Sequence, residues 1–185
     1  MKLGRQALTL VLRAAMWLFM RVRVEGAEQV PSEGPVIIIY NHITFLDPVV
    51  LTGALAREST AMSKVESFST PVLGLILRIF GAFPVQRGRV DRWALRYSLS
   101  VLEQGGVLLI APEGTRSGTP GLQEGKDGLA YLALRSGVPV VPAGISGAEE
   151  VVGNLRRGRR TPVCITFGRP FRLVAEDGRV RRPEM

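Results

Sequence analysis

Residues 34–48 read GPVIIIYNHITFLDP, and they set a pattern that the rest of the chain repeats. The run Val36–Tyr40 is apolar and rich in β-branched residues after a Gly-Pro pair, which predicts a buried strand. Asp47 and Pro48 are typical of the cap and first turn of an α-helix, which we expect to continue to about Ala56. A buried strand, a loop and a helix in this order predict one unit of an α/β domain.

Further apolar runs alternate with helix signals along the chain. The additional strands are expected at Thr60–Lys64, Ala82–Gln86, Val107–Ala111, Val138–Ala143 and Val163–Phe167. The additional helices are expected at 70–80, 91–104 and 127–136, because each begins at a threonine or an aspartate. Several of the strands are apolar on both faces, as in a parallel sheet that helices cover on both sides. The sequence therefore predicts an α/β fold with a largely parallel central sheet flanked by helices, with Trp93 in its core.

The composition indicates one compact domain with an anionic partner. The chain has 185 residues, 46% of them apolar, which is enough for one sizeable core. The formal net charge is +8, and arginine, which grips phosphate or carboxylate with two nitrogens, supplies most of the positive charge. The partner is then nucleic acid, an anionic membrane surface or a phosphorylated small molecule. We expect no nucleic acid, because neither stacking aromatics nor a recognition motif accompanies the charge.

The run RRGRR, 156–160, is either a solvated loop or a contact for lipid headgroups or coenzyme phosphates.

Residues 1–24 are expected to form a separate amphipathic N-terminal helix, ahead of a main domain at 25–185. Their apolar stretch is shorter than the ~20 residues needed to cross a bilayer, and Arg13 interrupts it. Arg5 and Arg13 gather on one narrow side of the helix, while Trp17 lies on a wide apolar face. This pattern favours a helix in the membrane interface, with its arginines on lipid phosphates. The alternative is a terminal helix that packs on the domain's own core.

The chain's single histidine, His42, precedes Asp47 by five residues. On a continuous helix this spacing would place the two side chains about 140° apart, so they can meet only across a turn. If His42 lies in the loop and Asp47 caps the next helix, the carboxylate can accept a hydrogen bond from the ring Nδ1–H and leave Nε2 as a base. The alternative is an ordinary loop histidine beside a capping aspartate.

Two more segments follow expected strands and carry groups suited to a phosphate or a polyol. The stretch APEGTRSG, 111–118, combines a carboxylate, hydroxyl groups and a guanidinium within a few residues. Glu113 can hold a hydroxyl group there, and Arg116 can hold a phosphate. The stretch GAFPVQRGR, 81–89, ends at Arg87 and Arg89, which can meet the same anion. In a parallel sheet such loops gather at the carboxyl ends of the strands.

In this order the motifs resemble those of the glycerolipid acyltransferase family, best known through the 1-acylglycerol-3-phosphate acyltransferases. The family's Asn-His, four residues, Asp motif matches 41–47, and its arginine-terminated strand matches 83–87. Its Phe-Pro-Glu-Gly-Thr-Arg-Ser motif matches 111–117, with Ala111 in place of phenylalanine, and its apolar strand with proline matches 140–145. Members usually continue past the point where this chain ends, so the chain resembles a member shortened at its C-terminus.

The resemblance implies transfer of an acyl chain from coenzyme A or acyl carrier protein to the hydroxyl of a lysophospholipid, most closely 1-acylglycerol 3-phosphate. His42 would be the general base, and Asp47 would orient it. The acceptor-binding groups would be Arg87, Glu113, Gly114, Thr115, Arg116 and Lys126, although plain solvent exposure of Lys126 stays equally open. We expect no metal and no cofactor besides the acyl donor. The protein would act as a peripheral or monotopic enzyme at the cytoplasmic face of a membrane.

Other readings of the sequence stay open. The acceptor is alternatively glycerol 3-phosphate or another lysolipid, because the motifs do not separate these. From a different class, the protein is a basic nucleic-acid-binding module or a lipid-binding protein without catalysis.

Overall fold

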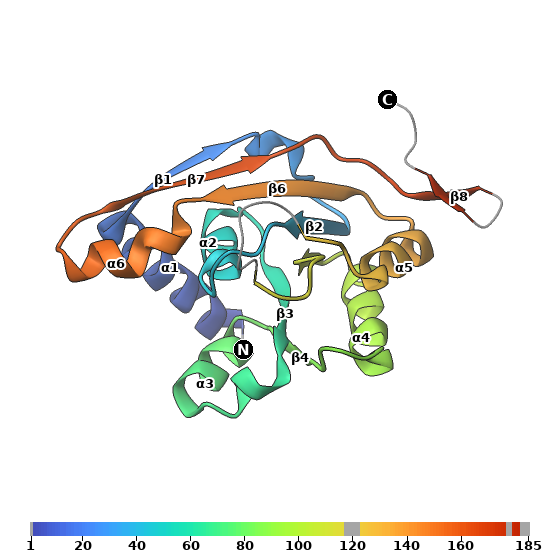
Figure 1. Ribbon diagram of the computed structural model, residues 1–185, viewed down its shortest axis with the longest axis horizontal. Coiled ribbons are helices and arrows are strands. Elements are labelled where there is room, and N and C mark those ends of the chain that lie inside the picture. The colour runs from blue at the N-terminus through green and yellow to red at the C-terminus, as the bar shows by residue number, and fades with distance from the viewer. Residues whose placement is uncertain (1, 117–122, 177–178, 182–185) are drawn as a thin grey trace.

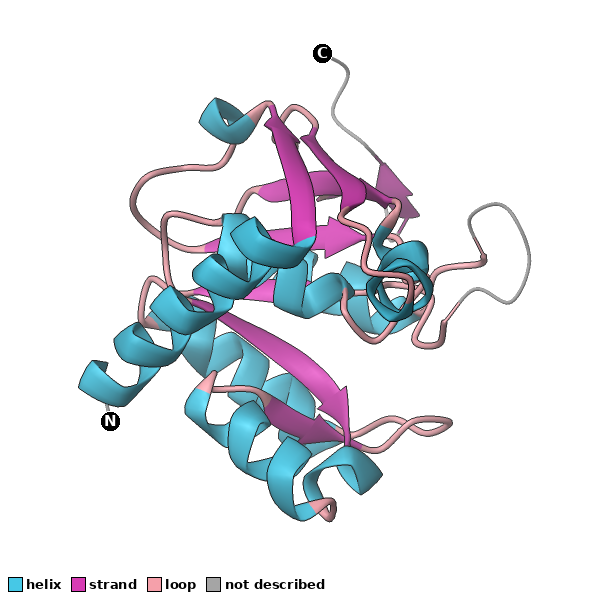
Figure 2. Ribbon diagram, turned by 90° about the vertical axis from the view of Figure 1, so that its left-hand side faces the viewer, coloured by secondary structure: helices cyan, strands magenta, loops and turns pink. Residues whose placement is uncertain are grey.

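The fold is a seven-stranded sheet between two layers of helices (Figures 1 and 2). The computed structural model describes residues 2–116, 123–176 and 179–181. The strands of the sheet are β1 Met20–Glu25, β2 Val36–Tyr40, β3 Ser59–Lys64, β4 Phe83–Val85, β5 Val107–Ile110, β6 Val140–Ser146 and β7 Thr161–Phe167. The helices are α1 Lys2–Phe19, α2 Asp47–Ala54, α3 Pro71–Ile79, α4 Arg92–Glu103, α5 Asp127–Ser136 and α6 Val151–Arg156. A separate hairpin pairs β8 Val174–Glu176 with β9 Arg179–Arg181.

The sheet has the order β1-β7-β6-β2-β5-β3-β4, with β2 at its centre. β2 pairs in parallel with β5 and with β6, so Ile39 lies level with Ile110 and Pro142. β3 and β4 continue the parallel arrangement beyond β5. The C-terminal ends of β2 to β6 therefore meet at one edge, which we name the carboxyl edge. The expected α/β fold with a largely parallel central sheet is confirmed.

The antiparallel strand β7 brings further segments to the carboxyl edge. Because β7 runs against β6, β7 begins where β6 ends. Met20 at the start of β1 lies level with Thr161, so the end of α1 also reaches this edge. The arginine-rich residues 156–160 directly precede β7 and adjoin the same edge.

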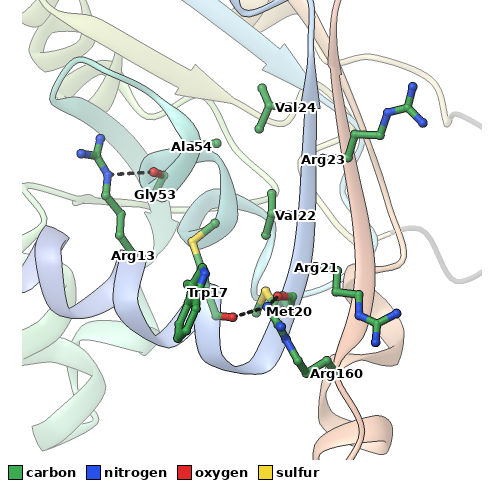
Figure 3. A pocket seen from close by; sticks show the side chains of 11 residues that line it. Arg13, Trp17, Met20, Arg21, Val22, Arg23, Val24, Gly53, Ala54 and Arg160 are labelled. Atoms are coloured by element: carbon green, nitrogen blue, oxygen red, sulfur yellow. Dashed lines mark hydrogen bonds between the residues drawn. The ribbon is translucent and has the colours of Figure 1, made fainter.

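The expected N-terminal helix is shorter than predicted. It ends at Phe19, and Met20–Glu25 forms an edge strand of the main sheet instead of the last part of the helix. The sequence contains the signal for this strand, since residues 21–24 alternate arginine and valine with a period of two. Val22 and Val24 point to one side of β1, and Arg21 and Arg23 point to the other (Figure 3).

Helix α1 packs on the domain's own core. Met16 is buried there and lies against Gly53 of α2. Arg13 donates from Nε to the Gly53 carbonyl at 3.0 Å (Figure 3), and Arg5 pairs with Glu58 at 3.4 Å. The prediction that these two arginines reach lipid phosphates is therefore wrong, because a helix C-terminal carbonyl and a carboxylate of the domain take their place.

The opposite face of α1 is open to solvent. Its large apolar side chains there, Leu10, Val11, Trp17 and Leu18, are between 55% and 74% exposed. Among the helices that the structure describes, none combines the length and the apolarity required to cross a membrane.

Two apolar clusters cover the two faces of the sheet. One face packs against α1, α2 and α6 and includes Ile38 and Leu51. The other packs against α4 and α5 and includes Ile37 and Leu132. In Figure 1 the first group of helices lies at the left and the second at the right. Each fully buried Ile or Leu side chain stabilises the fold by roughly 1.5–3 kcal/mol, so both helical layers hold the central strand in place.

Candidate active site

The loop between β2 and α2 folds around one carboxylate oxygen. Oδ2 of Asp47 lies 2.9 Å from Nδ1 of His42, and it accepts hydrogen bonds from the backbone N–H groups of Ile43 at 2.7 Å and Thr44 at 2.8 Å. Asp47 is fully buried, and His42 is 7% exposed. The contact between the two side chains that the sequence predicts is confirmed. An ionised carboxylate only accepts hydrogen bonds, so Nδ1 carries the ring hydrogen and Nε2 is the nitrogen that can take up a proton.

Asp47 does not act as the helix cap that we expected. It is the first residue of α2, Leu46 is the capping residue, and no side chain caps this end. The carboxylate instead turns back to the loop, where two backbone N–H groups bind it. Its position in the first helical turn still suits a negative charge, because the helix dipole is positive there.

Asn41 ties the same loop to the neighbouring strand β6. Its Nδ2 donates to the Ile145 carbonyl at 2.9 Å, and its Oδ1 accepts from the Ile145 N–H at 2.7 Å. The amide thus continues the strand pairing where the backbone of β2 leaves the sheet. The sequence motif includes Asn41 but gives no sign of this positioning role, because its partner is 104 residues away.

Tyr40 lies directly beside the histidine, although in the sequence it is simply the last residue of an apolar strand. The two rings meet edge to face, with centroids 6.0 Å apart and planes at 79°. Burial, and then the negative charge of Asp47, raise the pKa of Tyr40 far above its usual value, while the positive charge of Arg87 opposes the shift. Tyr40 therefore stays a neutral wall of the site.

Arg87 lies in a loop that Asp91 closes. Oδ2 of Asp91 accepts from the Gln86 N–H at 2.9 Å, and Oδ1 accepts from the Ala94 N–H at 3.0 Å. Asp91 therefore caps α4, as predicted, and also fixes the start of the loop. Arg87 itself is exposed on this loop.

The segment after β5 reaches the carboxyl edge next to β2. Glu113 is 2% exposed, and Gly114 adopts a left-handed φ of 67°, a conformation that favours glycine. The turn is held by hydrogen bonds from Gly114 N–H to the Ala111 carbonyl and from Lys126 N–H to the Pro112 carbonyl, at 3.0 and 2.8 Å.

The outer part of this segment is open to solvent. Thr115, Arg116 and Lys126 are exposed. The side chain of Lys126 passes beside Gly114, because a Cβ at Gly114 would lie 3.5 Å from its Cγ. Ser117, the last residue of the motif, lies outside the described residues.

The structure thus brings every predicted site residue to the carboxyl edge, on three loops. His42 and Asp47 are in contact, Glu113 follows the adjacent strand β5, and Arg87 follows β4. β4 lies three positions from β2 in the sheet, so the Arg87 loop flanks the histidine on the β4 side of the carboxyl edge. A base flanked by cationic groups can deprotonate a hydroxyl group of a molecule whose phosphate those groups hold.

The profile of a family described as Acyltransferase matches residues 21–146. The chain belongs to this acyltransferase family. It is 30% identical over 143 residues to the chloroplast 1-acyl-sn-glycerol-3-phosphate acyltransferase LPAT1 of Arabidopsis thaliana, covering 75% of this chain and 39% of that one. It is 36% identical over 130 residues to the mouse lysophospholipid acyltransferase LPCAT4, covering 67% of this chain and 24% of that one.

A solved structure is similar to most of the acyltransferase chain. The crystal structure of the 1-acyl-sn-glycerophosphate (LPA) acyltransferase PlsC from Thermotoga maritima superposes with a TM-score of 0.69 at 26% sequence identity. The match covers 91% of this chain and 70% of that one. The acyltransferase chain spans less than half the length of the plant and mouse relatives it matches.

We predict that Asp91→Ala destabilises the acyltransferase domain by about 1 kcal/mol at pH 7, because α4 loses its cap. Hydrogen bonds from the Ala94 and Gln86 N–H groups lower the pKa of Asp91 below its ordinary value of 3.8. A lowered pKa stabilises the fold above pH 3.8, and this contribution is lost as the pH falls through the folded-state pKa. Urea denaturation should therefore show a difference from the wild type at pH 7 that shrinks below pH 3.8.

Glu103→Ala, at the other end of α4, is the matched control, because that carboxylate caps nothing at the helix N-terminus. Equal stability changes for the two variants at pH 7 would contradict the role given to Asp91.

Proposed function

We propose that the protein moves a fatty acyl chain from the thioester of coenzyme A or acyl carrier protein to the free hydroxyl of 1-acylglycerol 3-phosphate, giving phosphatidic acid. The observation that carries this proposal is the buried contact between His42 and Asp47 at the carboxyl edge. The printed activities of the Arabidopsis and Thermotoga relatives support the choice of acceptor. Another lysolipid is the second candidate, since the mouse relative is named a lysophospholipid acyltransferase.

The histidine supplies the proton transfer that the reaction requires. Nε2 of His42 takes the proton of the acceptor hydroxyl as its oxygen attacks the thioester carbonyl carbon. The imidazolium that forms is stabilised by the carboxylate of Asp47. When the carbon–sulfur bond breaks, the leaving thiolate takes the proton back from His42. The products are the new ester and a free thiol, and the histidine is regenerated without an acyl-enzyme intermediate.

The neighbouring loops would hold the acceptor in place. Arg87, Arg116 and Lys126 supply positive charge for its phosphate. Glu113 and Thr115 supply groups for its glycerol hydroxyls, and Gly114 lets the backbone come close to them. Holding the acceptor in this way turns the attack into an effectively intramolecular step.

We predict that His42→Ala lowers kcat by about 10²- to 10⁴-fold, the usual contribution of a general base. Asp47→Asn should lower kcat much less, by about tenfold, because a hydrogen bond to a neutral acceptor stabilises the imidazolium by ~1–2 kcal/mol less than one to a carboxylate. The N–H groups of Ile43 and Thr44 keep the amide oxygen of the variant turned toward the ring, so the tautomer is preserved. Both variants are to be measured with purified protein, an acyl donor and lysophosphatidic acid in mixed micelles. Full turnover by folded His42→Ala would exclude the proposed base.

We predict that Arg87→Gln raises the KM for the lysophosphatidic acid acceptor by about tenfold or more, since a charge-assisted hydrogen bond to phosphate contributes ~1.5–3 kcal/mol. The KM for the acyl donor should not change. Arg135→Gln, an exposed arginine in the last turn of α5 and away from the three loops, is the control. An Arg135→Gln effect equal to that of Arg87→Gln would mean that general positive charge, and not a phosphate contact, is responsible.

We further propose that the protein docks on an anionic membrane through the outward face of α1 and the adjoining residues 156–160. Trp17 and Leu18 are exposed at the end of this helix. The guanidinium of Arg160 lies 5.7 Å above the Trp17 ring and donates to the Met20 carbonyl at 2.7 Å. The other arginines of 156–160 are exposed. Aromatic and basic groups side by side are typical of a surface that meets lipid headgroups.

A pocket of about 530 Å³ lies behind this surface, between α1, α2 and β1 (Figure 3). Its lining includes Met16, Met20 and Val22, so much of its wall is apolar. Arg13 and Arg160, at its margin, are bound to backbone carbonyls. Arg21 and Arg23 also line the pocket, and only Trp17 belongs both to it and to the exposed face of α1. Trp17 is therefore the point at which an acyl chain from the membrane would enter the apolar part of the pocket.

We predict that Trp17→Glu with Leu18→Glu lowers the partition coefficient onto anionic vesicles by at least tenfold. Each substitution removes a large apolar side chain from the interface and adds a negative charge that the anionic lipids repel. Val174→Glu in β8 is the control, since Val174 is also 52% exposed but lies outside α1. Vesicle sedimentation at low and high salt is the measurement. An equal loss for the control and the α1 variant would contradict the assigned surface.

A further inference from the structure

The outward face of α4 carries an aromatic stack that the proposed chemistry leaves unused. Trp93 and Tyr97 lie one helical turn apart, with ring centroids 5.2 Å apart and planes at 16°. The two residues are 48% and 40% exposed, so the prediction that Trp93 lies in the core is wrong. Phe83, buried in β4, contacts both rings, at 6.2 and 4.7 Å between centroids. A buried ring thus holds two stacked rings in a fixed position at the surface.

Positive charge lies beside the stack. Arg92 and Arg96 are exposed, one turn apart on the neighbouring stripe of α4. Neither forms an ion pair with any carboxylate that the structure describes. Like charges at this spacing destabilise a helix, and an anion between them removes the repulsion. This face of α4 therefore presents a planar aromatic surface next to two guanidinium groups that form no ion pair with the described carboxylates.

The stack is within reach of the proposed catalytic pair. α4 begins directly after the loop that carries Arg87, so Trp93 in its first turn lies at the carboxyl edge, on the sheet face that α4 covers. The distance from β2 to β4 is roughly 14 Å, the length of about four extended residues. The pantetheine arm of coenzyme A is an extended chain with two amide groups and has a comparable reach.

We propose that this face of α4 binds the adenosine 3′,5′-bisphosphate end of coenzyme A. The adenine stacks on Trp93, the phosphates bind Arg92 and Arg96, and the arm extends along the carboxyl edge and delivers the thioester to His42. The inference rests on the proposed function, which requires a thioester donor, and it selects coenzyme A as that donor.

The chemistry of the face favours a nucleotide over an acyl carrier protein. The flat face of a purine stacks on an exposed aromatic ring. Guanidinium groups bind phosphate through two nitrogens at once. A carrier protein would need about 800 Å² of matching surface on this side. The stack and its two arginines are instead the size of a single nucleotide.

Binding is tested first, without turnover. The chain has two tryptophans, so Trp17→Phe leaves Trp93 as the single tryptophan, which is excited selectively at a wavelength that tyrosine does not absorb. We expect adenosine 3′,5′-bisphosphate to quench this fluorescence in a saturable way. Arg92→Gln with Arg96→Gln should raise the Kd by about 10- to 100-fold, and Arg135→Gln on α5 should leave it unchanged. A fluorescence that does not respond to the bisphosphate would overturn the inference.

Kinetics with acyl-coenzyme A and with acyl-pantetheine then test whether the nucleotide contributes to donor binding during turnover. The Arg92→Gln, Arg96→Gln double variant should raise the KM for acyl-coenzyme A at least tenfold, with kcat and the KM for acyl-pantetheine unchanged. Trp93→Ala should behave like the double variant, while Trp93→Phe should keep most of the affinity. An equal rise for both donors, or a rise with acyl carrier protein alone, would overturn the inference. Bisphosphate binding without acyl transfer from any donor would instead refute the proposed function and leave the nucleotide site standing.

Discussion

Oδ2 of Asp47 accepts three hydrogen bonds, and this shared acceptor ties the shape of the loop to the orientation of His42. A buried carboxylate is costly unless hydrogen bonds satisfy it, and here the imidazole and two backbone N–H groups of the same loop all bind Oδ2, while Oδ1 has no partner among the described residues. The loop therefore folds around the charge that the histidine needs. A change that opens the loop also releases His42, so local stability and the proposed proton transfer depend on the same contact.

The parallel sheet is what turns three distant segments into one site. Tyr40, Ile110 and Val85 end neighbouring or nearby strands, and the loop after each of these strands contributes one part: the base, the buried Glu113 turn, or the Arg87 loop. Asn41 extends the pairing by one side chain beyond the backbone, and Asp91 closes the outermost loop. Each part is thus held by a contact to the rigid sheet or to a helix that packs on it, which is the preorganisation that positioning of substrates requires.

Local patterns carried most of the prediction. β2 was predicted with its observed bounds because its apolar run is sharply delimited, and the contact between His42 and Asp47 followed from their spacing and the turn between them. Contacts with distant partners were not predictable in the same way. Arg5 and Arg13 looked like surface charge, but they satisfy a carboxylate and a carbonyl of the domain. β1 was missed because the strand continues directly from an apolar helix, and Trp93 was placed inside because aromatic residues at helical spacing usually face a core.

The proposed direct transfer without an acyl-enzyme demands that donor and acceptor occupy the carboxyl edge together, and the proposed surfaces are arranged for this. Helix α1 packs on one face of the sheet, with residues 156–160 next to its C-terminal end, whereas α4 packs on the other face. An acceptor arriving from a membrane and a water-soluble thioester would then approach His42 from opposite sides without competing for one entrance. Arg87 lies on the loop that leads from β4 into α4, so its charge can hold the acceptor's phosphate while the donor's phosphates remain on α4. With separate routes, the donor and the acceptor can be bound at the same time without overlapping. The single histidine then has to act only where the acceptor hydroxyl meets the thioester.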